Sequence, residues 1–266
     1  MSVSLDLDNE HLAEQYERIS VERQFRNGQR LVAELKLEPG ESVLDIGAGT
    51  GLLAEYVADL VQPDGRVVGI DPLPHRIEIA NRRTRANLTF KVGNAFDLGE
   101  FSANQFDAVY LNAVFHWLPE KREPLRQIFR VLKQRGRLAI STGAKGNSNP
   151  LHLIRRRVLS RAPYNQYFAA EEAVRRVTAD ELSSLLTEGG FELIKVESRP
   201  RPAPEVTAEE AIQFSEASSF GNFLGHLPEQ LCRQAREEIK REFEAAAKAS
   251  ATQRQRFQII ALAIKP

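Results

Sequence analysis

The amino-acid sequence predicts an α/β fold built around a parallel sheet. Short apolar runs alternate with helical stretches, and three glycines follow the first run directly. Parallel strands need long crossover connections, which are usually helices, and strands covered by helices on both faces are apolar throughout. At 266 residues the chain is long enough for one large domain of this class with insertions.

Two helices are expected before the first strand. Residues 9–36 carry apolar side chains at helical spacing, and Pro39-Gly40 then provides a turn signal. Five strand-and-helix repeats follow. The expected strands are 42–47, 66–71, 88–94, 106–112 and 137–142, and the expected helices lie near 51–60, 74–84 and 120–133.

The regular alternation stops after the fifth strand, where residues 143–177 predict a helix, a loop and a second helix. The alternation then resumes. Thr178 and Glu181 have the spacing of a capping box, which predicts a helix beginning at Thr178. An apolar run at 191–198 predicts a sixth strand.

A second insertion precedes the last strand. Residues 200–206 contain three prolines, which favour an extended linker. Residues 207–249 have amphipathic helical patterning, and 256–266 predict a buried final strand. In an open parallel sheet, ligands bind beyond the carboxyl ends of the strands, so the loops that leave those ends are the first candidates for a site.

The composition excludes several classes of protein. The 36 basic residues balance 36 acidic ones, which gives no electrostatic reason to expect nucleic acid or an anionic membrane as partner. The single cysteine, Cys232, and five scattered histidines lack the spacing of metal ligands, so no metal site is expected. The N-terminus lacks a signal-peptide core and no segment is apolar enough to span a membrane, so a cytoplasmic location is expected.

The strongest motif is Val43-Leu44-Asp45-Ile46-Gly47-Ala48-Gly49-Thr50-Gly51, an apolar strand that runs into a glycine turn and a helix. Glycines let the backbone approach a ligand closely, and the helix N-terminus offers unpaired N–H groups. A dinucleotide fingerprint has G-x-G-x-x-G spacing, but Leu52 stands where its third glycine falls. The motif therefore predicts a polar ligand and argues against a nicotinamide or flavin cofactor.

Polar residues also end the next two strands. Asp71 ends the second strand, about 20 residues beyond the glycine turn, where a carboxylate can accept hydrogen bonds from both hydroxyls of a ribose. Asn94-Ala95 ends the third, and an amide beside an apolar neighbour suits the edge and face of an adenine. Together these residues predict a nucleoside site.

With these motifs, the sequence resembles the class I S-adenosylmethionine-dependent methyltransferases of the small-molecule type. The resemblance is carried by VLDIGAGTG at 43–51, HWLP at 116–119 and RVLK at 130–133 followed by Gly136, and it extends over residues 40–145. It is looser over 178–200 and 256–266. The resemblance implies a Rossmann-like sheet of seven strands in which the last is antiparallel and lies between the fifth and sixth.

The resemblance also implies how the chain is divided. Residues 1–145 would hold the N-terminal helices and the cofactor-binding half, 146–177 a helical cap insertion, 178–202 a core helix and strand, 203–252 a second helical insertion that acts as a lid, and 253–266 the final core strand.

Binding roles follow from the matching positions. The resemblance places Asp45, Gly47, Ala48 and Gly49 at the methionine half of the cofactor, Asp71 and Pro72 at the ribose, Asn94 and Ala95 at the adenine, and the main chain of Asn112 near the sulfonium. Two positions depart from the family pattern. Asn94 stands where an acid is usual, and Lys133-Gln134-Arg135-Gly136 replaces a Lys-Pro-Gly-Gly turn.

Two residues are candidates for catalysis. His116 follows the fourth strand and can act as a general base, since histidine titrates near neutral pH, although it can also simply pack beside Trp117. Tyr16 can hydrogen-bond cofactor or substrate if the N-terminal helices cover the site, or it can be a packing residue. Arginines within 143–177, including Arg155, can place one guanidinium over a carboxylate of the substrate.

The sequence therefore predicts an enzyme that transfers a methyl group from S-adenosylmethionine to a small organic acceptor, with an oxygen of a carboxylate or hydroxyl preferred. Two alternatives remain open at this point. One is a non-catalytic S-adenosylmethionine-binding sensor or assembly protein, and the other is an NAD-dependent oxidoreductase.

Overall fold

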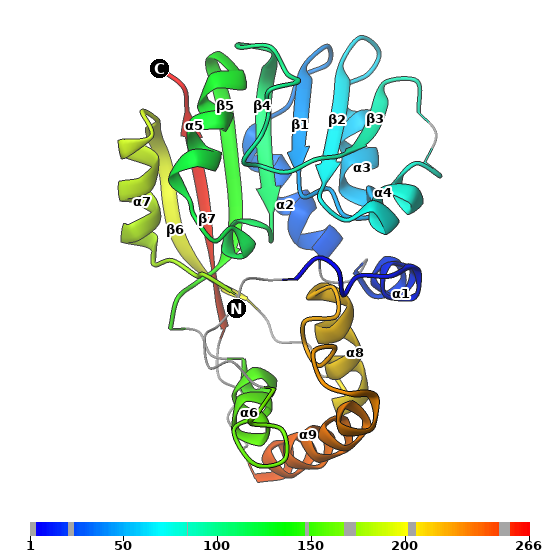
Figure 1. The fold of residues 1–266 in the computed structure, drawn as a ribbon. Helices are drawn as coiled ribbons and strands as arrows, with labels where there is room; N and C mark the ends of the chain where they lie inside the picture. The colour runs from blue at the N-terminus through cyan, green and yellow to red at the C-terminus, as the bar shows by residue number, and fades with distance from the viewer. Residues whose placement is uncertain are drawn as a thin grey trace.

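Seven strands form one sheet in the order β3-β2-β1-β4-β5-β7-β6. The structure is a computed structural model that describes residues 4–20, 24–83, 85–146, 149–167, 174–201, 206–249 and 256–266. The strands are β1 (Ser42–Ile46), β2 (Arg66–Asp71), β3 (Leu88–Val92), β4 (Phe106–Asn112), β5 (Leu132–Gly143), β6 (Glu192–Arg201) and β7 (Arg256–Ile264). The first five pair in parallel, and β7 is antiparallel to both β5 and β6. The predicted mostly parallel sheet, with its last strand inserted and reversed, is confirmed (Figure 1).

Helices cover both faces of this sheet: α2 (Arg26–Leu35), α3 (Leu52–Leu60) and α4 (Pro74–Ala80) on one face, and α5 (Arg122–Val131) and α7 (Ala179–Glu188) on the other. The remaining helices are α1 (Glu10–Ser20), α6 (Pro150–Leu159), α8 (Ala208–Ser218) and α9 (Glu229–Ala249), with a short 3-10 helix at Phe115–Trp117. Thr178 and Glu181 form the predicted capping box at the start of α7. Each residue caps the other's backbone N–H, at 3.1 and 2.8 Å.

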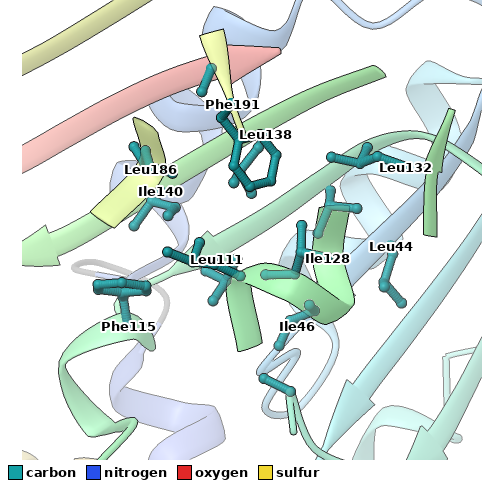
Figure 2. Close-up of a cluster of buried hydrophobic side chains, with 14 of the residues drawn as sticks. Leu44, Ile46, Leu111, Phe115, Ile128, Leu132, Leu138, Ile140, Leu186 and Phe191 are labelled. Atoms are coloured by element: carbon teal, nitrogen blue, oxygen red, sulfur yellow. The ribbon is translucent and has the colours of Figure 1, made fainter. Parts of the chain in front are cut away.

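Alternate residues of the central strands point into two separate cores. Leu44 and Ile46 of β1 face the core under α5 and α7, which Figure 2 shows with Ile128 of α5 and Leu186 of α7. Val43 faces the other core, under α2, α3 and α4. This period of two is the signature of a strand buried on both faces. It places Asp45, two residues beyond Val43, on the α2 and α3 side.

The two insertions meet to form one helical unit, which we call the cap: α6 from the first insertion and α8 and α9 from the second. Figure 1 shows the cap beyond the carboxyl ends of the parallel strands, with α1 between it and the sheet. The cap has its own apolar core, which includes Ile154, Ile212 and Ile239. Segments far apart in the sequence are therefore held together by burial of apolar surface.

Two expectations about local structure need correction, and a third is not tested. The strand β5 begins at Leu132, so the expected turn at 133–136 lies inside it, where Arg135 has a positive φ of 61°. The strand β6 continues through Pro200 to Arg201, where an extended linker was expected to begin. In the first insertion, residues 161–167 form turns, in agreement with the expected loop. The second helix was expected over residues that include 168–173, which lie outside the described residues.

Candidate active site

The turn after β1 is held by the neighbouring strand β2. The backbone N–H groups of Gly47 and Ala48 both donate to the carbonyl oxygen of Ile70, at 2.8 and 2.9 Å. Gly47 has a φ of +79°, and a Cβ at this position would lie 2.2 Å from Cγ2 of Val114. Only glycine fits here, because a side chain would be strained and would also clash.

Asp71, at the tip of β2, organises the glycine turn. Its Oδ2 accepts a hydrogen bond from the N–H of Gly49 at 2.8 Å, and its Oδ1 accepts one from the N–H of Leu73 at 3.0 Å. The residue is 5% exposed, and burial raises the pKa of its carboxyl despite the nearby Arg76 guanidinium. A carboxylate oxygen has two lone pairs, so both oxygens can accept a further hydrogen bond from a ligand.

Asp45 is buried next to the turn and pairs with a tyrosine. The hydroxyl of Tyr110, on β4, donates to Asp45 Oδ2 at 2.8 Å. Asp45 is 2% exposed, and desolvation raises the pKa of its carboxyl to about 8. Burial and the adjacent Asp45 raise the pKa of Tyr110 well above its usual value near 10. At neutral pH burial therefore favours the protonated carboxyl of Asp45, and the phenol of Tyr110 is un-ionised.

A cleft of about 40 Å³ lies along this turn. It is lined by Tyr16, Ser20, Gln24, Phe25, Asp45, Gly47, Ala48, Thr50, Leu52, Leu53 and Asn112. Asn112 donates from Nδ2 to the carbonyl oxygen of Gln24 at 3.0 Å, while its Oδ1 is buried and has no partner among the described residues. A buried acceptor without a donor is costly, so this atom marks a place where a ligand donor fits.

The helix α1 closes the cleft from outside. A Cβ on Gly49 would lie 3.3 Å from the Tyr16 ring, so the tyrosine packs directly on the turn. The guanidinium of Arg76 lies 4.0 Å from the centre of the same ring, and its Nη2 donates to the carbonyl oxygen of Ala217 on α8 at 2.7 Å. A space of this size holds only a few water molecules.

His116 lies beyond the end of β4, outside the lining of this cleft. Its Nδ1 lies 3.1 Å from the hydroxyl oxygen of Thr142, at the end of β5. The Trp117 ring packs between His116 and Phe220 of the cap, with centroid distances of 5.4 and 4.9 Å. Lys121 Nζ donates to the carbonyl oxygens of Phe115 and Leu118 and so fixes the turn that carries His116.

The predicted adenine contacts lie apart from the cleft. Asn94 is exposed, and its Oδ1 accepts a hydrogen bond from the N–H of Phe96 at 2.9 Å. Ala95 is buried in the core under α5 and α7. Pro72 is half-buried between Asp71 and Leu73. The roles of Asn94, Ala95 and Pro72 therefore stay predictions, whereas Tyr16, Asp45, Gly47, Ala48 and Asn112 are brought together.

Three functional candidates were missed from the sequence. Tyr110 carries a hydroxyl group between Val109 and Leu111 in the buried middle of β4, which is a signal in the sequence. Arg76 and Thr142 carried no such signal, because their contacts with α8 and with His116 join segments distant in the chain.

The arginines of the first insertion mostly serve the cap. Arg155 donates to the carbonyl oxygens of Phe223 and Asn222, and Arg157 and Arg161 form ion pairs with Glu242. These contacts account for Arg155, Arg157 and Arg161 without a ligand, whereas Arg176 lies next to Gly143 at the end of β5.

The described residues contain no group of three or more metal-binding side chains. No helix in the described part of the chain is long and apolar enough to cross a membrane.

This donor set fits a nucleoside that carries positive charge. The glycine turn leaves space for a ligand, and the carboxylate of Asp71 can accept hydrogen bonds from ribose hydroxyls. The carboxyl of Asp45 and the Oδ1 atom of Asn112, which has no partner among the described residues, can accept hydrogen bonds from an ammonium group. The fold and site define a class I S-adenosylmethionine-dependent methyltransferase. The sequence pattern of a family described as "Methyltransferase domain" matches residues 37–190, and the chain belongs to this family.

Relatives act on different acceptors. A demethylmenaquinone methyltransferase of Symbiobacterium thermophilum is 35% identical over 43% of this chain and 47% of its own length. An arsenite methyltransferase of Halobacterium salinarum is 30% identical over 60% of this chain and 39% of its own length. The O-methyltransferase cnsE of Penicillium expansum is 32% identical over 64% of this chain and 60% of its own length. The chain thus spans about half the length of the first of these, and none of them covers it whole.

Solved structures support the fold alone. A phosphoethanolamine N-methyltransferase 2 of Haemonchus contortus, in complex with S-adenosyl-L-methionine, has a TM-score of 0.63 at 19% identity, covering 97% of this chain and 57% of that one. The [4+2]-cyclase SpnF has a TM-score of 0.60 at 22% identity, covering 91% of this chain and 81% of that one. One fold carries different chemistry, so the reaction has to be argued from the site.

Proposed function

We propose that this protein transfers a methyl group from S-adenosylmethionine to an oxygen atom of a small organic acceptor, and that this oxygen belongs to a hydroxyl group. The observation that carries the proposal is the hydrogen bond between His116 Nδ1 and Thr142 Oγ1 at the carboxyl ends of two neighbouring strands. Among relatives, an O-methyltransferase of Pyrenophora dematioidea is 29% identical over 67% of this chain and 66% of its own length, which supports oxygen as acceptor.

The bound cofactor supplies a methyl group on a positively charged sulfur that is already a good leaving group. The protein therefore forms no covalent intermediate and mainly aligns the acceptor and excludes water. Alignment of this kind contributes on the order of 7–11 kcal/mol to lowering a barrier. Trp117 and Phe220 form an apolar wall beside His116, which suits the exclusion of water.

A hydroxyl group must lose a proton when it is methylated, and His116 is placed to accept it. When Nδ1–H donates to Thr142 Oγ1, the other ring nitrogen, Nε2, carries a lone pair and acts as the base. Thr142 then fixes the ring orientation, and its hydroxyl can accept the hydrogen bond from Nδ1–H in the tautomer that leaves Nε2 as the base. A carboxylate acceptor is already ionised at neutral pH and needs no base, so a histidine placed as a base favours a hydroxyl acceptor.

A carboxylate acceptor is usually held by an arginine fork. Arg155, Arg157 and Arg161 contact other cap residues instead, whereas Arg176 lies next to Gly143 at the end of β5 and is the arginine to test for this role.

The test is a panel of phenols, aliphatic alcohols, carboxylic acids and amines, each incubated with purified protein and S-adenosylmethionine. Formation of S-adenosylhomocysteine and the mass of the methylated product are measured. We expect turnover with hydroxyl acceptors, and a His116→Asn variant slowed by about 100-fold or more. His11→Asn, which changes an exposed histidine of α1, is the matched control. Turnover of acids or amines alone, or an unaffected His116→Asn enzyme, contradicts the proposal.

A further inference from the structure

Asp45 and Tyr110 form a buried pair at the base of the cleft. They are direct partners in the pairing of β1 with β4, so their side chains leave the sheet on the same face. Tyr110 is completely buried in the core under α2 and α3, which holds its ring in one orientation. Its hydroxyl therefore reaches one oxygen of Asp45 in a fixed geometry.

The two oxygens of Asp45 have different surroundings. Tyr110 is the hydrogen-bond partner of Asp45 among the described residues, and it engages Oδ2. Asp45 also lines the cleft, together with Gly47 and Asn112. The hydrogen bond from Tyr110 thus leaves Oδ1 as the oxygen available to a ligand.

No described cation offsets the charge of Asp45. The titratable groups that face it are Tyr110 from β4, Asp71 from β2 and Tyr16 from α1. Burial raises the pKa of Asp45, the hydrogen bond from Tyr110 lowers it and the negative charge of Asp71 raises it, so that together they bring it to about 8. The carboxyl is therefore mostly protonated at pH 7, and a cation placed beside it favours the ionised form.

We propose that Tyr110 is a positioning residue for cofactor binding: it orients Asp45 so that Oδ1 receives the ammonium group of the cofactor, and binding releases one proton from this pair. The O–H bond at Oδ1 breaks, its electron pair stays on the carboxylate, and the proton passes to solvent. An ammonium N–H then donates to Oδ1. The proposal concerns the cofactor and does not depend on which acceptor is methylated.

For the natural protein we expect proton release that depends on pH. With a pKa of about 8 before binding, about 0.9 proton is released at pH 7, and the number falls toward zero above pH 8. Affinity then rises by about tenfold per pH unit below pH 8 and levels off above it.

A Tyr110→Phe variant should move this behaviour to higher pH. It removes the hydrogen bond that lowers the pKa of Asp45, so the carboxyl holds its proton more tightly. We expect affinity at pH 7 to fall by about 3- to 10-fold, and release of the proton to persist at pH 8 and above.

The experiment is isothermal titration calorimetry with S-adenosylhomocysteine between pH 6 and 9, in phosphate and in Tris. The difference in heat between the two buffers counts protons. Asp45→Asn removes the titrating group and corrects for titration of the ligand's own ammonium. Tyr164→Phe is the matched control, because the Tyr164 hydroxyl also donates to a carboxylate, Glu238 in the cap, at 3.2 Å.

The expected result is proton release by the natural protein and by Tyr164→Phe, release shifted to higher pH in Tyr110→Phe, and none from this site in Asp45→Asn. Binding without proton exchange at pH 7 overturns the proposal but leaves cofactor binding intact. A folded Tyr110→Phe variant with the natural pH dependence also overturns it. If Tyr110→Phe does not fold, identical proton counts for the natural protein and Asp45→Asn overturn it.

Discussion

Replacing Asp71 with alanine tests how the glycine turn is built. The carboxylate accepts hydrogen bonds from the N–H groups of Gly49 and Leu73, and both donors lose their acceptor in Asp71→Ala. An unpaired buried polar group costs about 1–3 kcal/mol, and the two together cost about 2–6 kcal/mol. Removing a carboxylate whose burial is itself unfavourable offsets part of this, so we expect a loss of about 2–4 kcal/mol.

Two measurements check this prediction. For a chain of this size, the loss corresponds to a lowering of Tm on the order of 5–10 °C, followed by circular dichroism. Calorimetry with S-adenosylhomocysteine should show binding weaker by about 1–3 kcal/mol, since the turn is less ordered and the ribose loses an acceptor.

A matched control exists in the same chain. Asp97 also accepts a hydrogen bond from a backbone N–H, that of Gly99 at 2.9 Å, but in an exposed turn. Asp97→Ala should change both quantities little, because water replaces the lost acceptor. An Asp71→Ala variant with the natural Tm and the natural affinity refutes the account of this site.

Three further changes have defined outcomes. Gly47→Ala should lower the free energy of unfolding by about 2–4 kcal/mol in urea titrations, because its Cβ meets Val114 and its φ is positive; an unchanged midpoint contradicts this. Between pH 4 and 8, Asp45 is ionised in the unfolded chain and protonated in the native one, so native stability falls as pH rises, by roughly 1.4 kcal/mol per unit. Asp45→Asn should remove that slope in urea titrations from pH 5 to 8, and a slope equal to that of the natural protein opposes this. Thr142→Val removes the hydrogen-bond partner of His116, so it should lower kcat by about tenfold and shift the pH–rate profile of hydroxyl methylation while cofactor affinity stays unchanged. A pH–rate profile identical to that of the natural protein would show that the contact between Thr142 and His116 has no role in catalysis.

The sheet could be predicted from the sequence because its signals are local. Apolar strands such as 106–112 alternate with helical patterns, and the order of buried and crossover segments dictates a parallel sheet. The reversed last strand has no local signal, and its placement came from the resemblance to a family. The early start of β5 was missed because Lys133-Gln134-Arg135-Gly136 has turn composition, although Arg135 takes the left-handed conformation within the strand.

The sequence predicted those site residues that lie in one motif or on the strand next to it. Asp45 and Gly47 lie in a single run, and Asp71 lies on the adjacent strand, so their proximity follows from strand order. The contact of Tyr110 with Asp45 depends on register, which a single sequence does not specify. The contact of Arg76 with α8 depends on how the cap folds back, and no local pattern encodes it.

The prediction of a binding role for Asn94 is limited by a local alternative. Its amide suits an adenine edge, but the same oxygen suits the N–H two residues along, and the structure has that local bond. A polar side chain after a strand therefore predicts a binding role and a turn equally well.

The most direct test of the account is a crystal structure with S-adenosylhomocysteine and a hydroxyl acceptor that the panel identifies. We expect the ribose hydroxyls at Asp71, the methionine half beside Asp45 and Asn112, and the acceptor oxygen between the sulfur and His116 Nε2. A nucleoside bound away from the glycine turn, or an acceptor that presents nitrogen or carbon to the sulfur with His116 out of reach, contradicts it.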